Sequence, residues 1–119
     1  MLIIEVKKMD PINRLDRRIC TKCNLQNDLK KAINSHVSIK LEYMHKSNEI
    51  RLKRDVIKEE LELSKAPTEK QVQAYIEEKL LFLKSELEIS KENVNMIQRD
   101  LDLIDDEIRL CEYEIQNME

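Results

Sequence analysis

Two cysteines and two histidines in the first half of the chain are residue types from which a zinc site could be built. Cys20 and Cys23 form a C-x-x-C pair, and twelve residues separate Cys23 from His36. That spacing fits a zinc finger, but eight residues then separate His36 from His45, where three to five are usual. Nine positions along a helix rotate by about 180°, so the two imidazoles would face opposite ways. We therefore expect no metal and no cofactor, and interpret the cysteines as free thiols.

Acidic side chains are the next candidates for chemistry, for example Glu77-Glu78 and the run Asp105-Asp106-Glu107. Carboxylates that act as acid and base need a concave, partly dry site that separates their pKa values. A rod-like pair of helices offers no such site, and neither histidine has a plausible nucleophile or orienting partner. We expect a solvated acidic face and no enzymatic activity.

A cluster of cations is the remaining candidate site. It comprises Lys46, Arg51, Lys53, Arg54 and Lys58. Three of these recur at i, i+3 and i+7 and would share one stripe of a helix, which could follow a phosphate backbone. Single-strand binders usually add stacking aromatic side chains, and only Tyr43 is close in sequence. A basic face packed against an acidic helix explains the cluster equally well.

Long helices must position these residues, and the second helix organises the chain. Thr68 is spaced to accept a hydrogen bond from the backbone N–H of Gln71, whose side chain can reach back to the Thr68 N–H, as in a capping box. Pro67 prevents a helix from running straight through this point. No Gly or Pro follows, so we predict one acidic helix over residues 68–118, roughly 75 Å long.

Apolar residues of this second helix repeat every seven positions. With Leu80 at position a, only Ser90 is plainly polar among the a and d positions. Such a repeat keeps one seam facing a partner helix and favours a left-handed coiled coil. The predicted seam consists of Ile76, Leu80, Leu83, Leu87, Val94, Ile97, Leu101, Ile104, Ile108 and Ile115.

A second apolar stripe occupies the c positions of the same heptad. It comprises Tyr75, Phe82, Ile89, Met96, Leu103 and Leu110. A two-stranded coiled coil leaves position c in water, so this stripe requires another neighbour. With 119 residues and two long helices, we expect a helical homo-oligomer rather than a self-sufficient monomeric bundle.

The first half of the chain predicts a basic helix over residues 11–65. Asp10-Pro11 is a strong helix start, and it leaves residues 1–9 as an arm whose conformation the sequence does not decide. Residues 21–28 are rich in cap and turn formers, so a break there stays open.

The apolar pattern of this first helix is less regular than that of the second. Ile33, Val37, Leu41 and Met44 step by four, four and three residues. The only clear reversal precedes Thr68, so the two helices should form an antiparallel hairpin.

Composition supports a single all-α domain. Gly is absent and charged residues make up 38% of the chain, which argues against tight β-turns and phosphate-cradling loops. Residues 1–58 carry a net charge of +7 and residues 59–119 one of −10. Either the basic helix folds back on the acidic one, or it also faces a polyanion. No signal peptide or membrane span is evident and the three cysteines are odd in number, so we expect a cytoplasmic protein without disulfides.

One stretch resembles a known family. Residues 34–42, Asn-Ser-His-Val-Ser-Ile-Lys-Leu-Glu, resemble the Asn-x-His-x-Ser-Ile-Lys-x-Glu run in the first long helix of the phage recombination mediators of the UvsY type. The segment Leu52-Lys53-Arg54 is similar to a basic segment downstream in those proteins, after a two-residue shift. This chain departs from them in having no Trp, no Gly at the interhelical turn and an acidic second half, which would confine DNA contact to one face.

The resemblance implies a homo-oligomeric ring that binds single-stranded DNA, contacts the single-strand-binding protein and helps to load the strand-exchange recombinase in the host cytoplasm. It implies neither catalysis nor a cofactor. Lys53 and Arg54 would contact DNA by this match, and Arg51 and Lys58 join them on helical geometry. The alternative is a structural or adaptor coiled coil whose second helix recruits a protein partner.

Overall fold

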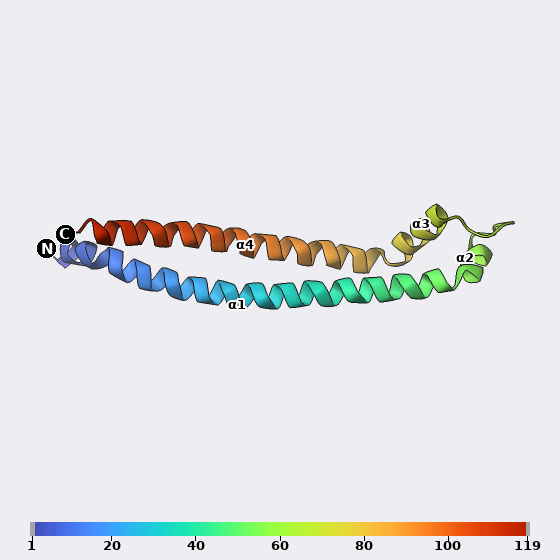
Figure 1. Ribbon diagram of the computed structural model, residues 1–119, viewed down its shortest axis with the longest axis horizontal. Helices are drawn as coiled ribbons and strands as arrows, with labels where there is room; N and C mark the ends of the chain where they lie inside the picture. The colour runs from blue at the N-terminus through green and yellow to red at the C-terminus, as the bar shows by residue number, and fades with distance from the viewer. Residues whose placement is uncertain (1, 119) are drawn as a thin grey trace. The chain divides into compact units, whose positions relative to one another are not determined.

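The computed structural model of the chain (Figure 1) describes residues 2–118, and side chains from residue 12 to residue 118. Its helices are α1 (Leu2–Leu52), α2 (Arg54–Glu60), α3 (Glu69–Lys79) and α4 (Leu81–Gln116). The described part of the chain contains no strand, so the predicted all-α class is confirmed. Two units divide the chain, one formed by Met1–Ile33 with Asn93–Glu119 and the other by Asn34–Glu92.

In the first unit the beginning of α1 and the end of α4 lie side by side and antiparallel (Figure 1). Three ion pairs cross between them, Arg14–Glu114 at 2.6 Å, Arg18–Glu107 at 2.5 Å and Lys22–Asp105 at 2.7 Å. Residue numbers that rise along α1 meet numbers that fall along α4, as antiparallel pairing requires. Each pair is more than a third exposed and contributes about 0–1 kcal/mol, so the pairs orient the helices more than they stabilise them.

The second unit has its core where α2 meets α3. Ile57 of α2 is 1% exposed and contacts Val72 and Ile76 of α3, which are 0% and 1% exposed. Partly buried apolar side chains surround this core, from Tyr43 and Ile50 on α1 and Leu80 after α3. The seven-residue helix α2 is too short to be stable alone, so this burial holds it in place.

A Schellman motif ends α2 without glycine. The N–H of Glu62 donates to the carbonyl of Glu59 at 3.2 Å, and the N–H of Leu63 donates to that of Lys58 at 3.0 Å. The motif requires a left-handed residue, and Glu62 takes it with a φ of 53°. A Cβ is unfavourable in that region, so Glu62 is a strained position that glycine would relieve.

The predicted capping box at the start of α3 is confirmed. The Thr68 hydroxyl accepts a hydrogen bond from the Gln71 N–H at 3.2 Å, and the Thr68 N–H donates to Gln71 Oε1 at 2.9 Å. These bonds satisfy two backbone donors at the helix start, which is why the helix begins here and not earlier.

The single helix expected over residues 68–118 is two helices that meet at Leu80. Helix α3 buries Val72, Tyr75 and Ile76, at heptad positions g, c and d. Further along, α4 buries Leu83 at position d. Val72 and Tyr75 lie off the a and d seam, and between the two helices the backbone leaves helical geometry at Leu80 with φ −106° and ψ 24°.

The first helix also differs from its predicted bounds. Helix α1 begins at Leu2 rather than at Pro11, and it ends at Leu52, where Lys53 leaves helical geometry with φ −107° and ψ 51°. Residue 1 and the side chains at the Asp10 cap lie outside the described residues. The helix is continuous over residues 21–28, where the Thr21 hydroxyl donates to the Arg17 carbonyl at 2.9 Å instead of capping a new helix.

Candidate nucleic-acid interface

The predicted cation cluster lies in the second unit, around the turn between α1 and α2. Arg51 is in the last turn of α1, Lys53 lies between the helices, and Arg54 and Lys58 are on α2. The prediction that Arg51, Arg54 and Lys58 share one stripe requires a continuous helix. That prediction is wrong, because the helix is interrupted at Lys53. What brings the residues together is therefore the turn itself.

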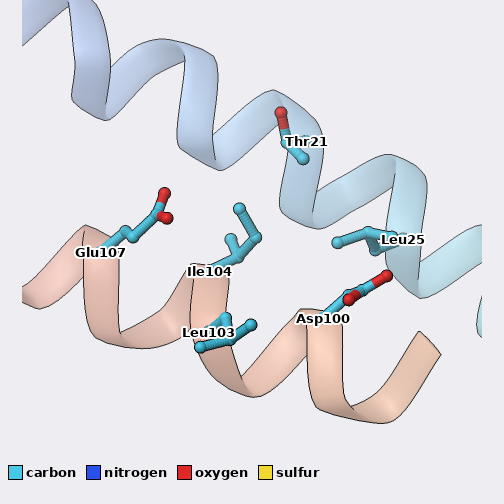
Figure 2. Close-up of a pocket in the computed structure, with 6 residues that line it drawn as sticks. All are labelled: Thr21, Leu25, Asp100, Leu103, Ile104 and Glu107. Atoms are coloured by element: carbon cyan, nitrogen blue, oxygen red, sulfur yellow. The ribbon is translucent and has the colours of Figure 1, made fainter. Parts of the chain in front are cut away.

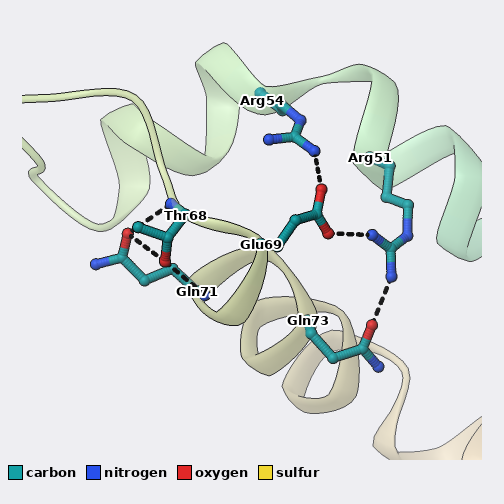
Figure 3. A network of polar contacts seen from close by, with 6 residues as sticks. All are labelled: Arg51, Arg54, Thr68, Glu69, Gln71 and Gln73. Carbon is teal, nitrogen blue, oxygen red and sulfur yellow. Dashed lines mark hydrogen bonds and ion pairs between the residues drawn. The ribbon is translucent and has the colours of Figure 1, made fainter.

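Two of these cations are already engaged by α3 (Figure 3). Arg51 Nη1 donates to Glu69 Oε2 at 2.8 Å, while Arg54 donates to the other oxygen of the same carboxylate. Arg51 also donates from Nη2 to Gln73 Oε1 at 2.5 Å. The hydrogen bond from Arg54, and then that from Arg51, lower the pKa of Glu69 below its ordinary value of 4.5. Glu69 is therefore an anion held between two guanidinium groups.

The lysines of the cluster are less constrained. Lys46 Nζ lies 3.1 Å from Glu42 on the same helix, a pair that is about half exposed. Lys53 and Lys58 are exposed and make no ion pair with any residue that the structure describes. These two ammonium groups are the cations of the cluster that are open to an anion from outside.

An apolar recess adjoins Lys53. It has a volume of about 160 Å³ and is lined by Ile50, Lys53, Val56, Ile57 and Tyr75. The Tyr75 hydroxyl donates to Glu60 Oε2 at 2.5 Å, and this bond together with burial raises the pKa of Tyr75 to about 12. The recess thus combines an aromatic wall, aliphatic side chains and one cation.

The heptad positions of the second half differ sharply in exposure. Every a and d residue of the predicted seam is buried or half-buried in its unit. The c positions after Tyr75 are exposed, with Phe82 77% and Ile89 70% exposed in the second unit and Met96, Leu103 and Leu110 between 54% and 62% in the first. Tyr75 is the exception at 9%, because α3 turns it toward α2.

The buried face of α1 differs from the apolar stripe that its sequence suggests. Ile33, Val37, Leu41 and Met44 are each at least 41% exposed. Between residues 25 and 43 the buried or half-buried positions are Leu25, Leu29, Ala32, His36, Ile39 and Tyr43. These alternate in steps of four and three, which is a heptad signal, but Ala and His hide it from a reading based on hydropathy.

A polar pair lies within this face in the second unit. His36 Nδ1 is 2.8 Å from Ser90 Oγ, and Ser90 Oγ donates to the Leu87 carbonyl at 2.8 Å. The direction of the hydrogen bond between His36 and Ser90 depends on the tautomer of the histidine. The one polar d position of the heptad is thus satisfied by a histidine from α1.

A larger recess lies in the first unit between α1 and α4 (Figure 2). Its volume is about 290 Å³, and Thr21 and Leu25 of α1 line it with Leu103, Ile104 and two acids of α4. The acids Asp100 and Glu107 lie seven residues apart on one helix, about 10 Å along its axis, and Glu107 is paired with Arg18. That separation and pairing give no acid–base couple.

The cysteines occupy different environments. Cys20 and Cys23 are exposed free thiols on α1, and Cys111 is a buried free thiol on α4. Among the described residues no three His, Cys, Asp or Glu side chains come together as a metal site would require. No helix in residues 2–118 is long and apolar enough to cross a membrane.

Comparison of the chain with protein-family models, with curated proteins and with solved structures finds no match. The site must therefore be interpreted from its own residues.

Proposed function

We propose that this chain is a non-enzymatic helical protein that binds single-stranded DNA at the turn between α1 and α2. The observation that carries the proposal is the pair of exposed, unpaired ammonium groups of Lys53 and Lys58, beside Arg51 and Arg54. Cations concentrated on one short segment attract a phosphate backbone through counterion release, without need of a deep pocket.

The apolar recess beside Lys53 supports the single-stranded form of the ligand. Proteins that bind single strands combine a basic track with apolar or aromatic surface for the bases. Here Val56, which is 44% exposed, supplies apolar surface next to the cation, and Tyr75, which is 9% exposed, lines the same recess. A duplex keeps its bases stacked inside, so the recess would add little to duplex binding.

The biological role follows from the resemblance of residues 34–42 to the phage recombination mediators. On that basis the chain assembles into a homo-oligomer, contacts the single-strand-binding protein and helps to load a strand-exchange recombinase. The exposed c positions, Phe82 and Ile89 among them, supply apolar surface for contacts between copies.

A double variant tests the DNA site. Lys53→Ala with Lys58→Ala removes two exposed cations that form no ion pair with any described residue, so the fold should remain intact. We expect the affinity for labelled oligo-dT to fall and the slope of log K against log salt to shrink by about 1.4, or 0.7 per lost phosphate contact.

The matched control is Lys65→Ala with Lys91→Ala, which makes the same charge change at exposed lysines of the same unit. Equal losses in the two double variants would show that binding follows overall charge and would remove the site from residues 53–58.

The second candidate is a coiled-coil adaptor that recruits a helical protein partner. The exposed c positions of α4 favour it, because they fit a partner helix as well as another copy of the chain. An adaptor, which would also oligomerise, would ignore oligo-dT and would form a complex with a helical partner protein. Binding of oligo-dT would favour the first proposal.

A further inference from the structure

Glu69 contacts two arginines of the cation cluster through its carboxylate. The Glu69 side chain is 65% exposed, and Arg51 and Arg54 approach its carboxylate from the end of α1 and the start of α2 (Figure 3). Two guanidinium groups that hold a carboxylate can also bind another oxyanion of similar size at the same position. In nucleic acids that oxyanion is the phosphodiester, which arginine side chains bind readily.

We propose that Arg51 and Arg54 form a phosphate clamp that Glu69 occupies in the free protein, so that Glu69 is an internal competitor of the nucleic-acid phosphate. The proposal rests on the DNA site described above. It adds the identity of the phosphate-binding pair and a contact that restrains binding.

The arrangement suits exchange of one anion for another. Both ion pairs are at the surface, with the arginines 36% and 45% exposed, so water screens them and neither is strong. Arg51 also keeps its hydrogen bond to Gln73, which would hold its guanidinium in place when Glu69 moves away. Glu69 lies in the first turn of α3, which the capping box at Thr68 keeps helical without the ion pairs.

The unpaired lysines would make the first contact with a strand. Lys53 lies between the two arginines in sequence, and Lys58 follows on α2. A strand attracted by these ammonium groups brings its next phosphates to the clamp, where they compete with Glu69 at high local concentration. The structure thus predicts that affinity is set by how well the strand displaces one carboxylate.

Glu69→Gln tests the proposal, with Glu59→Gln as its matched control. Both changes remove one negative charge near the cluster, but the Glu59 side chain forms no hydrogen bond or ion pair with any residue that the structure describes. Each exposed ion pair is worth up to about fivefold in an equilibrium constant. We expect Glu69→Gln to tighten binding of a labelled oligo-dT of about 16 nucleotides three- to tenfold, and Glu59→Gln less than twofold.

A second background separates competition from a structural effect. In a variant carrying Arg51→Gln and Arg54→Gln, the further change Glu69→Gln should give no gain beyond that of Glu59→Gln. Circular dichroism and thermal unfolding verify that each variant keeps its helices.

The outcomes distinguish this inference from the proposed function. Tighter binding by Glu69→Gln that depends on the arginines supports the clamp, and so does binding by this variant when the wild-type chain binds nothing. Equal effects of Glu69→Gln and Glu59→Gln overturn the clamp but leave DNA binding at the lysines standing. An absence of binding in every variant overturns both.

Discussion

Truncation of Ile57 to alanine is the most informative test of how the second unit is held together. Ile57 is 1% exposed and connects the seven-residue helix α2 to α3. The change removes three buried carbons, and at about 0.8 kcal/mol for each the transfer cost is about 2.4 kcal/mol. The cavity left behind raises this value, so we expect a loss of about 3 kcal/mol.

Val56→Ala is the control, because Val56 is the neighbouring residue of α2 and is 44% exposed. Its loss should stay below about 1 kcal/mol. Amide hydrogen exchange across residues 54–79 reports the stability of this unit directly, and a loss of 3 kcal/mol corresponds to protection about a hundredfold lower. Equal effects of the two substitutions would refute the assignment of Ile57 to a core, since both side chains would then be similarly exposed in solution.

Three further predictions concern other parts of the chain. Leu101→Asp places an unpaired charge at a position that is 6% exposed in the first unit, so helicity measured by circular dichroism should fall. Leu103→Asp, at a position that is 61% exposed, should keep its helicity, and equal behaviour of the two variants would contradict the burial of Leu101 in the seam. Glu62→Gly should stabilise the chain by about 0.5–1 kcal/mol in urea unfolding, because glycine accepts the left-handed conformation that Glu62 adopts, and a loss would show that the motif is absent in solution. Because the pKa of Tyr75 is raised, its hydrogen bond to Glu60 stabilises the fold fully below pH 10, and this contribution is lost toward pH 12. The difference in unfolding free energy between wild type and Tyr75→Phe should therefore vanish over that interval, and a difference that persists would contradict the bond.

Elements that depend on interactions between residues close in the chain can be predicted from the sequence. The capping box at Thr68 is legible because both of its partners lie within four residues. The heptad from Ile76 to Ile115 is legible because nearly all its members are aliphatic, and these side chains are buried or half-buried in their units.

Features that depend on contacts between residues far apart in the chain cannot be predicted from the sequence in the same way. No helix breaker stands at Lys53 or Leu80, and the chain leaves helical geometry at both positions because α2 and α3 bury Ile57 and Val72 against each other. The buried face of α1 cannot be predicted from hydropathy, because it includes Ala32 and His36.

One part of the candidate site can be predicted from the sequence and the other part cannot. The cations between Lys46 and Lys58 are visible as a cluster in the sequence. Their partner Glu69 is fifteen residues beyond Arg54, across a turn, and only the folded chain brings that carboxylate to both arginines. The distinction between engaged arginines and open lysines therefore required the structure.

The salt dependence of oligo-dT binding by the wild-type chain, followed by fluorescence anisotropy, tests the central claim most directly. Up to five cations in the cluster predict affinity that falls with salt, with a slope of log K against log salt no steeper than about −3.5. Such a slope, with clear binding at about 50 mM salt, is the result that we expect. Failure to bind in the wild type and in Glu69→Gln at that salt concentration would contradict a nucleic-acid role and would leave the coiled-coil adaptor as the better account.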